Sequence, residues 1–297
     1  MDRKTKKGKN LKKFDTSPQA DRTLKNFITR TYTAIIYVAV IVSAICTHPF
    51  SFLVLFALVV GLALWEFYGM AWESKGWHKL IGIVGGMYLF TASFLNAGGY
   101  VSGYIYYPYF LFLFALLIAS LYHITPNPVK DCAMSFFGQF YCAGLLSTLN
   151  FIVFDPVTKQ FFPYYALFIF IFVWLNDTGA YLTGITLGRH PLFVRISPKK
   201  TWEGLWGGLT ITLLSSLVIA YYFPDTIRWY HSLALAGITV VFGTWGDLVE
   251  SLLKRTCGTK DSGTLLPGHG GILDRFDSVI LASPVIFVYL ELFIWHH

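Results

Sequence analysis

The sequence predicts an all-α integral membrane protein, a polytopic bundle of about nine transmembrane helices whose N-terminus faces the cytosol. Apolar residues make up 55% of the 297 residues and charged residues only 13%, whereas a soluble domain carries about 25% charged residues. The mean hydropathy of the chain is +0.55. Because a chain this poor in charge cannot cover a water-facing surface, most of its outer surface is expected to face lipid.

Residues 1–30 form a basic segment with ten Lys or Arg and three Asp. This composition predicts a disordered cytosolic tail, which either lies against anionic headgroups or only sets the topology. The segment has no apolar core, so we expect no cleavable signal peptide.

Apolar runs separated by polar breaks follow this tail, and a membrane helix needs roughly 20 apolar residues. The predicted spans are 31–47, 50–72, 81–95, 108–124, 134–154, 163–187, 205–223, 232–250 and 279–295. We expect residues 31–160 to form an N-terminal scaffold. Residues 161–297 are then a C-terminal catalytic region with cytosolic loops at 188–204 and 251–278.

The positive charges are distributed unequally between the two sides of this topology. The segments on the side of the N-terminus carry 21 of the 23 Lys and Arg, and the opposite loops carry only Lys159 and Arg228. Without the tail, 11 remain on the first side against two on the other. The positive-inside rule therefore favours nine spans and a cytosolic N-terminus.

An acidic residue inside an apolar run marks a first polar cluster. Asp177 follows Asn176 in FIFVWLNDTGAYLTG, where a carboxylate costs roughly 2.5–3.5 kcal/mol on insertion scales. We interpret Asp177 as functional, the alternative being a buried residue that packs helices. Ala180, Gly184 and Gly188 follow at four-residue spacing, which predicts close contact with a neighbouring helix.

The predicted loop 188–204 contains a second polar cluster, RHPLFVRISPKKTWEG. Two adjacent ammonium groups near a helix start suit a polyphosphate, which binds cations and free backbone N–H groups. The alternative is a loop that anchors to the membrane surface. The candidate ligand-facing residues here are Ser197, Lys199, Lys200, Thr201 and Glu203.

The third cluster begins with GDLVESLLKR, which places four polar side chains on one face of a helix that leaves the membrane. These are Asp247, Glu250, Ser251 and Lys254. The following KDSGTLLPGHGGILDRFD is rich in glycine, and glycines let a loop wrap closely around a ligand. Asp274 and Asp277 share a face if the last helix begins near Gly271, and Arg275 lies between them.

Hard carboxylates, basic side chains and a glycine-rich loop together indicate phosphate chemistry. Mg²⁺ is bound by one or two carboxylates plus substrate phosphates, and nucleotidyl transfer depends on positioning and charge neutralisation. Seven of the 16 acidic residues fall in the three clusters, which converge on the cytosolic side of the predicted topology. Glu66, near the end of the second span, is interpreted as a structural residue at the membrane interface.

The segment Ser251–Asp277, SLLKRTCGTKDSGTLLPGHGGILDRFD, resembles the signature of phosphatidate cytidylyltransferases. The segments NDTGAYLTG, SPKKTWEG and GDLVES are similar to blocks of the same family and occur in the same order. The specific resemblance covers roughly residues 174–280, and the N-terminal half is similar only as a hydrophobic multi-span region. This family makes CDP-diacylglycerol from CTP and phosphatidate, releases pyrophosphate and requires Mg²⁺.

The resemblance implies roles for individual residues. The implied metal set is Asp247 and Asp274, with Asp277 and Glu250 as weaker candidates, for Mg²⁺ with a monovalent cation such as K⁺ beside it. The implied catalytic set is Asp247, Asp274, Lys254, Arg275 and His269. A phosphate contact or a loop-structure role is favoured over proton transfer for His269, because a phosphate monoester dianion is already a competent nucleophile. The implied substrate-binding set is Asp177, Ser197, Lys199, Lys200, Thr201, Glu203, Ser251, Arg255, Lys260, Asp261, Gly270 and Gly271.

The resemblance also implies a homodimer in the inner (cytoplasmic) membrane, with an active site that faces the cytosol and membrane lipids around it. We expect no nucleic-acid partner. The alternatives are a related enzyme that acts on an ether-linked lipid phosphate and, in a different class, a membrane transporter. A CDP-alcohol phosphotransferase is disfavoured, because members of that family resemble each other in a motif that begins Asp-Gly and this chain has no such dipeptide.

Overall fold

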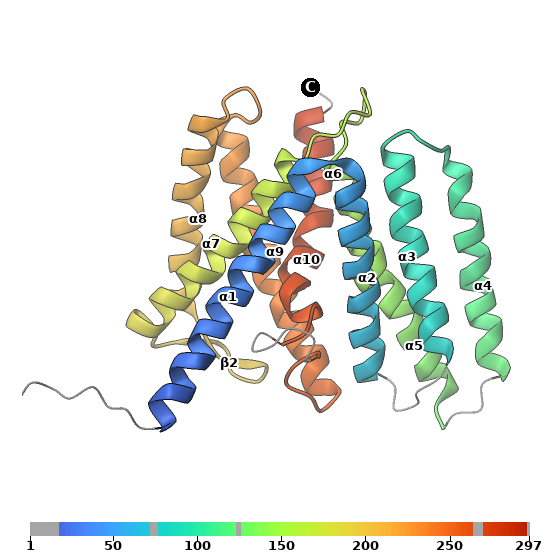
Figure 1. Ribbon diagram of the computed structural model, residues 1–297, viewed down its shortest axis with the longest axis horizontal. Helices are drawn as coiled ribbons and strands as arrows, with labels where there is room; N and C mark the ends of the chain where they lie inside the picture. The colour runs from blue at the N-terminus through green and yellow to red at the C-terminus, as the bar shows by residue number, and fades with distance from the viewer. Residues whose placement is uncertain (1–17, 72–76, 123–125, 264–269, 296–297) are drawn as a thin grey trace, which may run out of the picture.

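The chain folds into a bundle of long helices with one small β-hairpin (Figure 1). The computed structural model describes residues 18–71, 77–122, 126–263 and 270–295, without the side chains of residues 18–30 and 77–78. The elements are α1 (Pro18–Thr47), α2 (Pro49–Ala71), α3 (Trp77–Ala97), η1 (Gly103–Tyr106), α4 (Tyr107–Tyr122), α5 (Pro128–Gly138), η2 (Gln139–Gly144), α6 (Leu145–Ile152), α7 (Tyr164–Leu187), β1 (Pro191–Phe193), β2 (Ser197–Thr201), α8 (Trp202–Tyr222), α9 (Trp229–Thr256), α10 (Leu273–Leu290) and η3 (Glu291–Trp295). The short elements η2 and η3 are π-helical, and η1 is a 3₁₀-helix.

Within the described ranges, eight helical stretches are long and apolar enough to cross a membrane. α5, η2 and α6 together form one of them, and the apolar part of α1, Thr31–Thr47, is shorter. The all-α class and the membrane-spanning bundle are therefore confirmed. α9 extends beyond the predicted span 232–250 to Thr256, as expected for a helix that carries Ser251 and Lys254 as it leaves the membrane. Its last two turns carry charged side chains that lower the hydropathy, yet they stay helical and α9 packs against α10.

The basic segments gather at one end of the bundle. The described start of α1, the hairpin and the C-terminal end of α9 lie at this end, and the last helix finishes at the opposite end (Figure 1). Because the described start of α1 and the end of the last helix lie at opposite ends of the bundle, the chain crosses it an odd number of times. Which end faces the cytosol stays a prediction.

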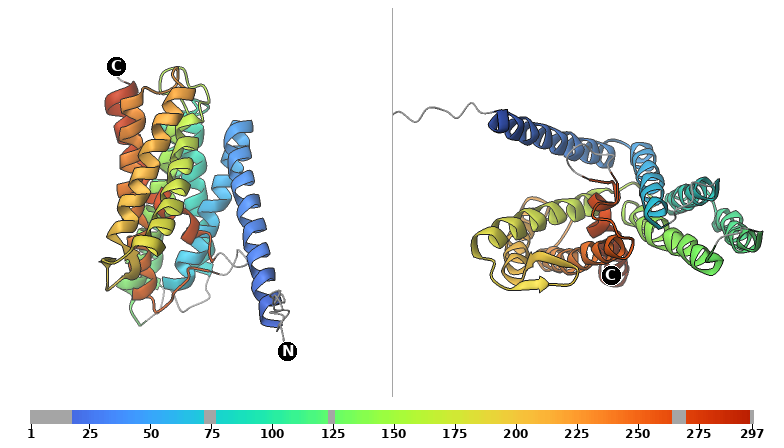
Figure 2. Two further views of the ribbon diagram at one scale, coloured as in Figure 1. Left: turned by 90° about the vertical axis from the view of Figure 1, so that its left-hand side faces the viewer. Right: turned by 90° about the horizontal axis from the view of Figure 1, so that it is seen from below.

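α10 lies between two groups of helices (Figure 2). It packs against α9 and α7 on one side and against α6 and α2 on the other, and α1 lies outside against α2 and α7. Residues from both halves of the chain therefore meet on the surface of α10.

Small residues bring the helices of the C-terminal group close together. A Cβ atom on Gly204 of α8 would lie 2.9 Å from the backbone oxygen of Ala180 on α7 and 3.6 Å from the Cα of Gly184. A Cβ atom on Gly246 of α9 would lie 2.3 Å from the backbone oxygen of Asp277 on α10. The predicted helix contact at Ala180 and Gly184 is confirmed.

The loop between α7 and α8 contains an antiparallel hairpin that the sequence did not reveal. β1 and β2 pair Pro191 with Thr201 and Phe193 with Ser197. Strands of three and five residues are too short to show a clear alternation of apolar and polar side chains. Thr201 also caps α8, because its Oγ1 accepts a hydrogen bond from the backbone N–H of Gly204 at 3.1 Å.

Candidate functional site

A cavity of about 430 Å³ lies between α7, β2, α8, α9 and α10. Its polar lining includes Asn176, Asp177, Lys199, Lys200, Thr201 and Asp247. Its apolar lining includes Tyr181, Ile185, Leu192 and Leu205. The structure thus brings the first two predicted clusters and the start of the third to one surface.

Lys200 and Asp247 form an ion pair across this cavity. Lys200 comes from the end of β2 and Asp247 from α9, so the hairpin presents the ammonium group to the helix. Asp247 also accepts a hydrogen bond from Ser251 Oγ at 3.3 Å, one turn further along α9. Lys199 lines the same cavity and is exposed.

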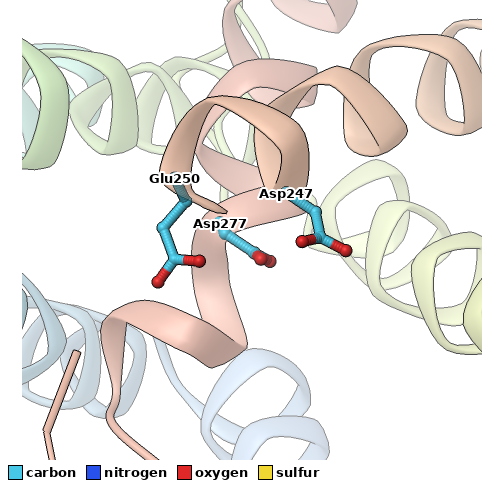
Figure 3. Close-up of side chains that lie close together, drawn as sticks. All are labelled: Asp247, Glu250 and Asp277. Atoms are coloured by element: carbon cyan, nitrogen blue, oxygen red, sulfur yellow. The ribbon is translucent and has the colours of Figure 1, made fainter. Parts of the chain in front are cut away.

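Three carboxylates converge beside the cavity. Asp247 and Glu250 come from α9 and Asp277 comes from α10, and an oxygen of each lies within 4.8 Å of the others. The Asp277 carboxylate lies between the other two (Figure 3). Glu250 is fully buried and Asp277 is 9% exposed. The i, i+3 spacing on α9 follows from the sequence, and the tight contact at Gly246 adds the third group from α10.

The charges at this site do not balance. Its carboxylates are Asp177, Asp247, Glu250, Asp274 and Asp277. The nearby cationic side chains within the described part of the chain are Lys199 and Lys200, which line the cavity, Lys254, and Arg275, which interacts electrostatically with Asp177. Buried carboxylates in excess of their cationic partners are costly. The site therefore fits a divalent cation, and its all-oxygen donor set is the type that Mg²⁺ prefers.

Asp274 is bonded differently from the other three predicted metal ligands. Its Oδ1 accepts from Lys254 Nζ at 2.5 Å, and its Oδ2 accepts from the backbone N–H groups of Gly271 at 2.8 Å and Ser262 at 3.1 Å. Lys254 also forms an ion pair with Glu250. The structure thus groups three of the four predicted metal ligands and places Asp274 next to them, bonded to Lys254. Gly270, at a positive φ of 82°, lies against this carboxylate, and a Cβ there would be 2.8 Å from Oδ2.

Glu66 of α2 was predicted to be a structural residue at the membrane interface, and its contact with the start of α10 was not predicted. Its carboxylate accepts hydrogen bonds from Ser262 Oγ at 3.0 Å and from the backbone N–H groups of Ile272 at 3.0 Å and Leu273 at 2.8 Å. The available signal was an acidic residue inside an otherwise apolar helix. Its partners are about 200 positions away in the chain, and no local pattern reveals them.

Glu203 holds the base of the hairpin and does not line the cavity. Its carboxylate accepts from the backbone N–H groups of Arg189 at 3.1 Å and His190 at 3.2 Å. It also pairs with the His190 ring Nδ1 at 2.6 Å.

Four other predicted residues form no hydrogen bond or ion pair with these carboxylates within the described part of the chain. Arg255 donates to the Thr259 backbone oxygen at 3.2 Å, and Lys260 and Asp261 are exposed. Ser197 begins β2 and is half-buried. His269 lies outside the described residues.

Comparison with known proteins agrees with this chemistry. A model of the "Cytidylyltransferase family" matches residues 28–293. The chain is 49% identical over 127 residues to the phosphatidate cytidylyltransferase of Staphylococcus saprophyticus, 48% identical to that of Staphylococcus aureus and 46% identical to that of Staphylococcus haemolyticus. These matches cover 43% of this chain and 49% of each relative, so the chain spans about half the length of the curated relatives it matches.

Proposed function

The chain belongs to the cytidylyltransferase family, and we propose that it transfers a cytidylyl group from CTP to phosphatidate, forming CDP-diacylglycerol and pyrophosphate. The observation that carries this proposal is one cavity, within a membrane-spanning bundle, lined by lysines, carboxylates and an apolar wall. A nucleotide triphosphate matches the charged part, and a lipid phosphate matches the charged and apolar parts together. The related enzymes are phosphatidate cytidylyltransferases by name, which supports phosphatidate as the acceptor.

We assign a Mg²⁺ site to Asp247, Glu250 and Asp277. Mg²⁺ bound there would neutralise negative charge on the phosphates of CTP and on the departing pyrophosphate. Asp274 lies outside this group of three, with its carboxylate bonded to Lys254, Gly271 and Ser262, so its role as a ligand and the presence of K⁺ stay predictions.

The lysines perform the binding steps. Lys199 and Lys200, at the end of the hairpin that lines the cavity, bind phosphate oxygens. When substrate binds, Lys200 leaves its ion pair with Asp247 and pairs with a phosphate. Tyr181 and Ile185 provide apolar contact for the lipid. An oxygen of the phosphatidate phosphate attacks the α-phosphorus of CTP. The bond from that phosphorus to the oxygen bridging to the β-phosphorus breaks, and pyrophosphate leaves with the electron pair.

We propose that the cavity end of the bundle faces the cytosol from the inner membrane. The basic segments lie at this end, as the positive-inside rule requires (Figure 1). CTP then arrives from the cytosol and phosphatidate from the inner leaflet. The homodimer is proposed from the family resemblance.

The test is formation of CDP-diacylglycerol by purified, detergent-solubilised protein given labelled CTP, phosphatidate and Mg²⁺. We expect lipid-dependent product that EDTA abolishes and that falls roughly 10²–10³-fold in Asp247→Asn, as when a group that stabilises transition-state charge is lost. Asp274→Asn is expected to lose activity as well, since Lys254 loses a charged partner. Asp155→Asn is the matched control, because this carboxylate caps a turn in the loop between α6 and α7, and that loop lies at the end of the bundle opposite the hairpin (Figure 1).

Folded protein that forms no product with several phosphatidic acids would overturn the assignment. Product from an ether-linked lipid phosphate instead would identify the related nucleotidyltransferase. Equal loss of activity in Asp155→Asn and Asp247→Asn would argue against the proposed site.

A further inference from the structure

Glu66 occupies an unusual position for a carboxylate. It lies in α2, whose other residues are apolar or small apart from Ser51, and is only 6% exposed. Among the described residues its hydrogen-bond donors are uncharged: one hydroxyl and two backbone N–H groups. A carboxylate is expensive to bury in a membrane protein, so a buried one is a candidate for function.

The donors of Glu66 lie on both sides of residues 264–269 in the sequence. Ser262 precedes that segment, and Ile272 and Leu273 follow it. Gly263 and Gly271 allow this approach, because a Cβ on either would lie 2.4 Å or 2.3 Å from a Glu66 carboxylate oxygen. Glu66 therefore joins the chain after α9 to the start of α10.

The same short stretch of backbone also holds Asp274. The N–H of Gly271 donates to Asp274, and the next two N–H groups, of Ile272 and Leu273, donate to Glu66. These consecutive donors belong to the N-terminus of α10, where carboxylates are favourable. Glu66 thus fixes the backbone immediately before Asp274 and one turn before Asp277.

The position of α10 along α9 decides whether the carboxylates meet. Asp277 comes from α10, whereas Asp247 and Glu250 come from α9. A shift of the first turn of α10 would separate Asp277 from the other two and would change the bond between Asp274 and Lys254. Within the described part of the chain, the hydrogen bonds of Glu66 go to Ser262 and to the backbone of Ile272 and Leu273, so its effect on the site carboxylates is indirect.

We propose that Glu66 is a positioning residue for the cation site. It holds the start of α10 at the position along α9 that brings the Asp277 carboxylate next to those of Asp247 and Glu250. It thereby sets the affinity of this site for a divalent cation. The link to catalysis rests on the proposed cytidylyltransferase function, whereas the link to cation binding does not.

The experiment compares Glu66→Gln and Glu66→Asp with the matched control Tyr68→Phe in full-length purified protein. Tyr68 lies on the same helix and is fully buried, and its hydroxyl donates to the backbone oxygen of Ser135 and accepts from Gln139 Nε2. Gln keeps the side-chain volume but places an NH₂ group against a backbone donor. Asp keeps the charge but is too short to span the same three donors.

Binding of Mn²⁺ is measured by electron paramagnetic resonance without substrate, and turnover is measured across Mg²⁺ concentrations. We expect Glu66→Gln to weaken Mn²⁺ binding roughly 10–100-fold, the usual cost of losing a group that orients metal ligands. Excess Mg²⁺ should restore part of its turnover. Tyr68→Phe is expected to lower the melting temperature while Mn²⁺ affinity stays unchanged. Glu66→Asp should bind Mn²⁺ with intermediate affinity.

Mn²⁺ affinity in Glu66→Gln equal to wild type, or absence of Mn²⁺ binding in wild type, would overturn the proposal. Wild-type protein that binds Mn²⁺ but forms no CDP-diacylglycerol would overturn the proposed reaction alone. If Glu66→Gln does not fold, Ser262→Ala removes one of the three donors and is expected to weaken Mn²⁺ binding by a smaller factor. Unchanged affinity in that variant would also contradict the proposal.

Discussion

Glycines serve opposite purposes in the two helix groups on either side of α10. In the N-terminal group they make room for large side chains: a Cβ on Gly85 would lie 2.2 Å from the ring of Phe112, and one on Gly82 would lie 2.7 Å from the ring of Tyr68. In the C-terminal group several face the backbone of a neighbouring helix, as Gly246 does against the carbonyl of Asp277 and Gly204 against that of Ala180. The first arrangement fills space between helices, and the second brings helix backbones together.

This difference explains where the polar side chains gather. Asp and Asn side chains are short, so residues on two helices can share a ligand only where the backbones approach closely. The N-terminal group instead packs phenylalanine rings between helices, with the ring centroids of Phe52 on α2 and Phe90 on α3 6.3 Å apart. It supplies a rigid scaffold and, through Glu66, one hydrogen-bonded support for the site.

The strongest test of this comparison is Gly246→Ala. The new methyl group would press on the Asp277 backbone, which cannot move without moving α10, so the three carboxylates should separate. Overpacking of this kind costs about 1–3 kcal/mol of stability. We expect turnover to fall at least ~100-fold, as for lost charge stabilisation, measured together with thermal unfolding.

Alanine substitutions at two other glycines are the controls for Gly246→Ala. Gly237→Ala on the same helix meets nothing within 4 Å and should leave turnover unchanged. Gly86→Ala in the N-terminal group meets the end of the Leu64 side chain at 2.2 Å and the Cβ of Ala143 at 3.1 Å, neither of which lines the cavity, so stability should fall without loss of turnover per folded molecule. Equal losses of turnover in Gly86→Ala and Gly246→Ala would remove the distinction between the two groups.

Lys200→Met tests the charged surface of the C-terminal group. It removes the ion pair with Asp247 and the proposed phosphate contact, and kcat/KM for CTP should fall roughly 10–100-fold, the cost of one or two charge-assisted hydrogen bonds. Lys199→Met, beside it, should cost less because Lys199 is exposed and has no ion pair among the described side chains. A larger loss in Lys199→Met would reverse the proposed division of roles.

Glu203→Gln should have a smaller effect, because Glu203 supports the hairpin from outside the cavity. The variant loses the charged bond to His190 and keeps one acceptor for the backbone N–H groups of Arg189 and His190. We expect KM for CTP to rise about 2–5-fold, in line with a hydrogen bond worth about 1 kcal/mol or less, with kcat unchanged. A fall in kcat as large as the fall in kcat/KM expected for Lys200→Met would place Glu203 in the reaction itself.

The sequence predicted those features that depend on local periodicity or composition. Hydropathy identified the spans, and i, i+3 spacing placed Asp247 and Glu250 on one face of α9. Asp277 joins these two carboxylates only because α10 is positioned along α9 at a particular level. The sequence does not determine that level. Asp274 was grouped with the metal ligands on resemblance, and the structure places it on Lys254.

Features that depend on distant contacts were not predictable. The hairpin is too short to show a pattern, and its effect, the delivery of Lys200 to Asp247, follows from its pairing and not from composition. Glu66 was interpreted as an interfacial residue because the sequence around it contains none of its hydrogen-bond donors. These donors lie more than 190 positions further along the chain. A buried carboxylate in an apolar helix was the only signal, and it gives no partner.

Phe52→Leu tests the scaffold and should have the smallest effect on catalysis. Phe52 is fully buried and packs against Phe56, Phe90 and Phe94, so the shorter side chain loses ring contacts and leaves a partial cavity. We expect about 1–2 kcal/mol of lost stability, seen as a lower midpoint of thermal unfolding. Turnover per folded molecule should stay within about two-fold, because changes in packing far from the site act on unfolding alone. Phe114→Leu, on the exposed face of α4, is the matched control and should change neither quantity. A large loss of turnover in Phe52→Leu would mean that the packing of these phenylalanine rings also positions α10, the role proposed above for the hydrogen bonds of Glu66.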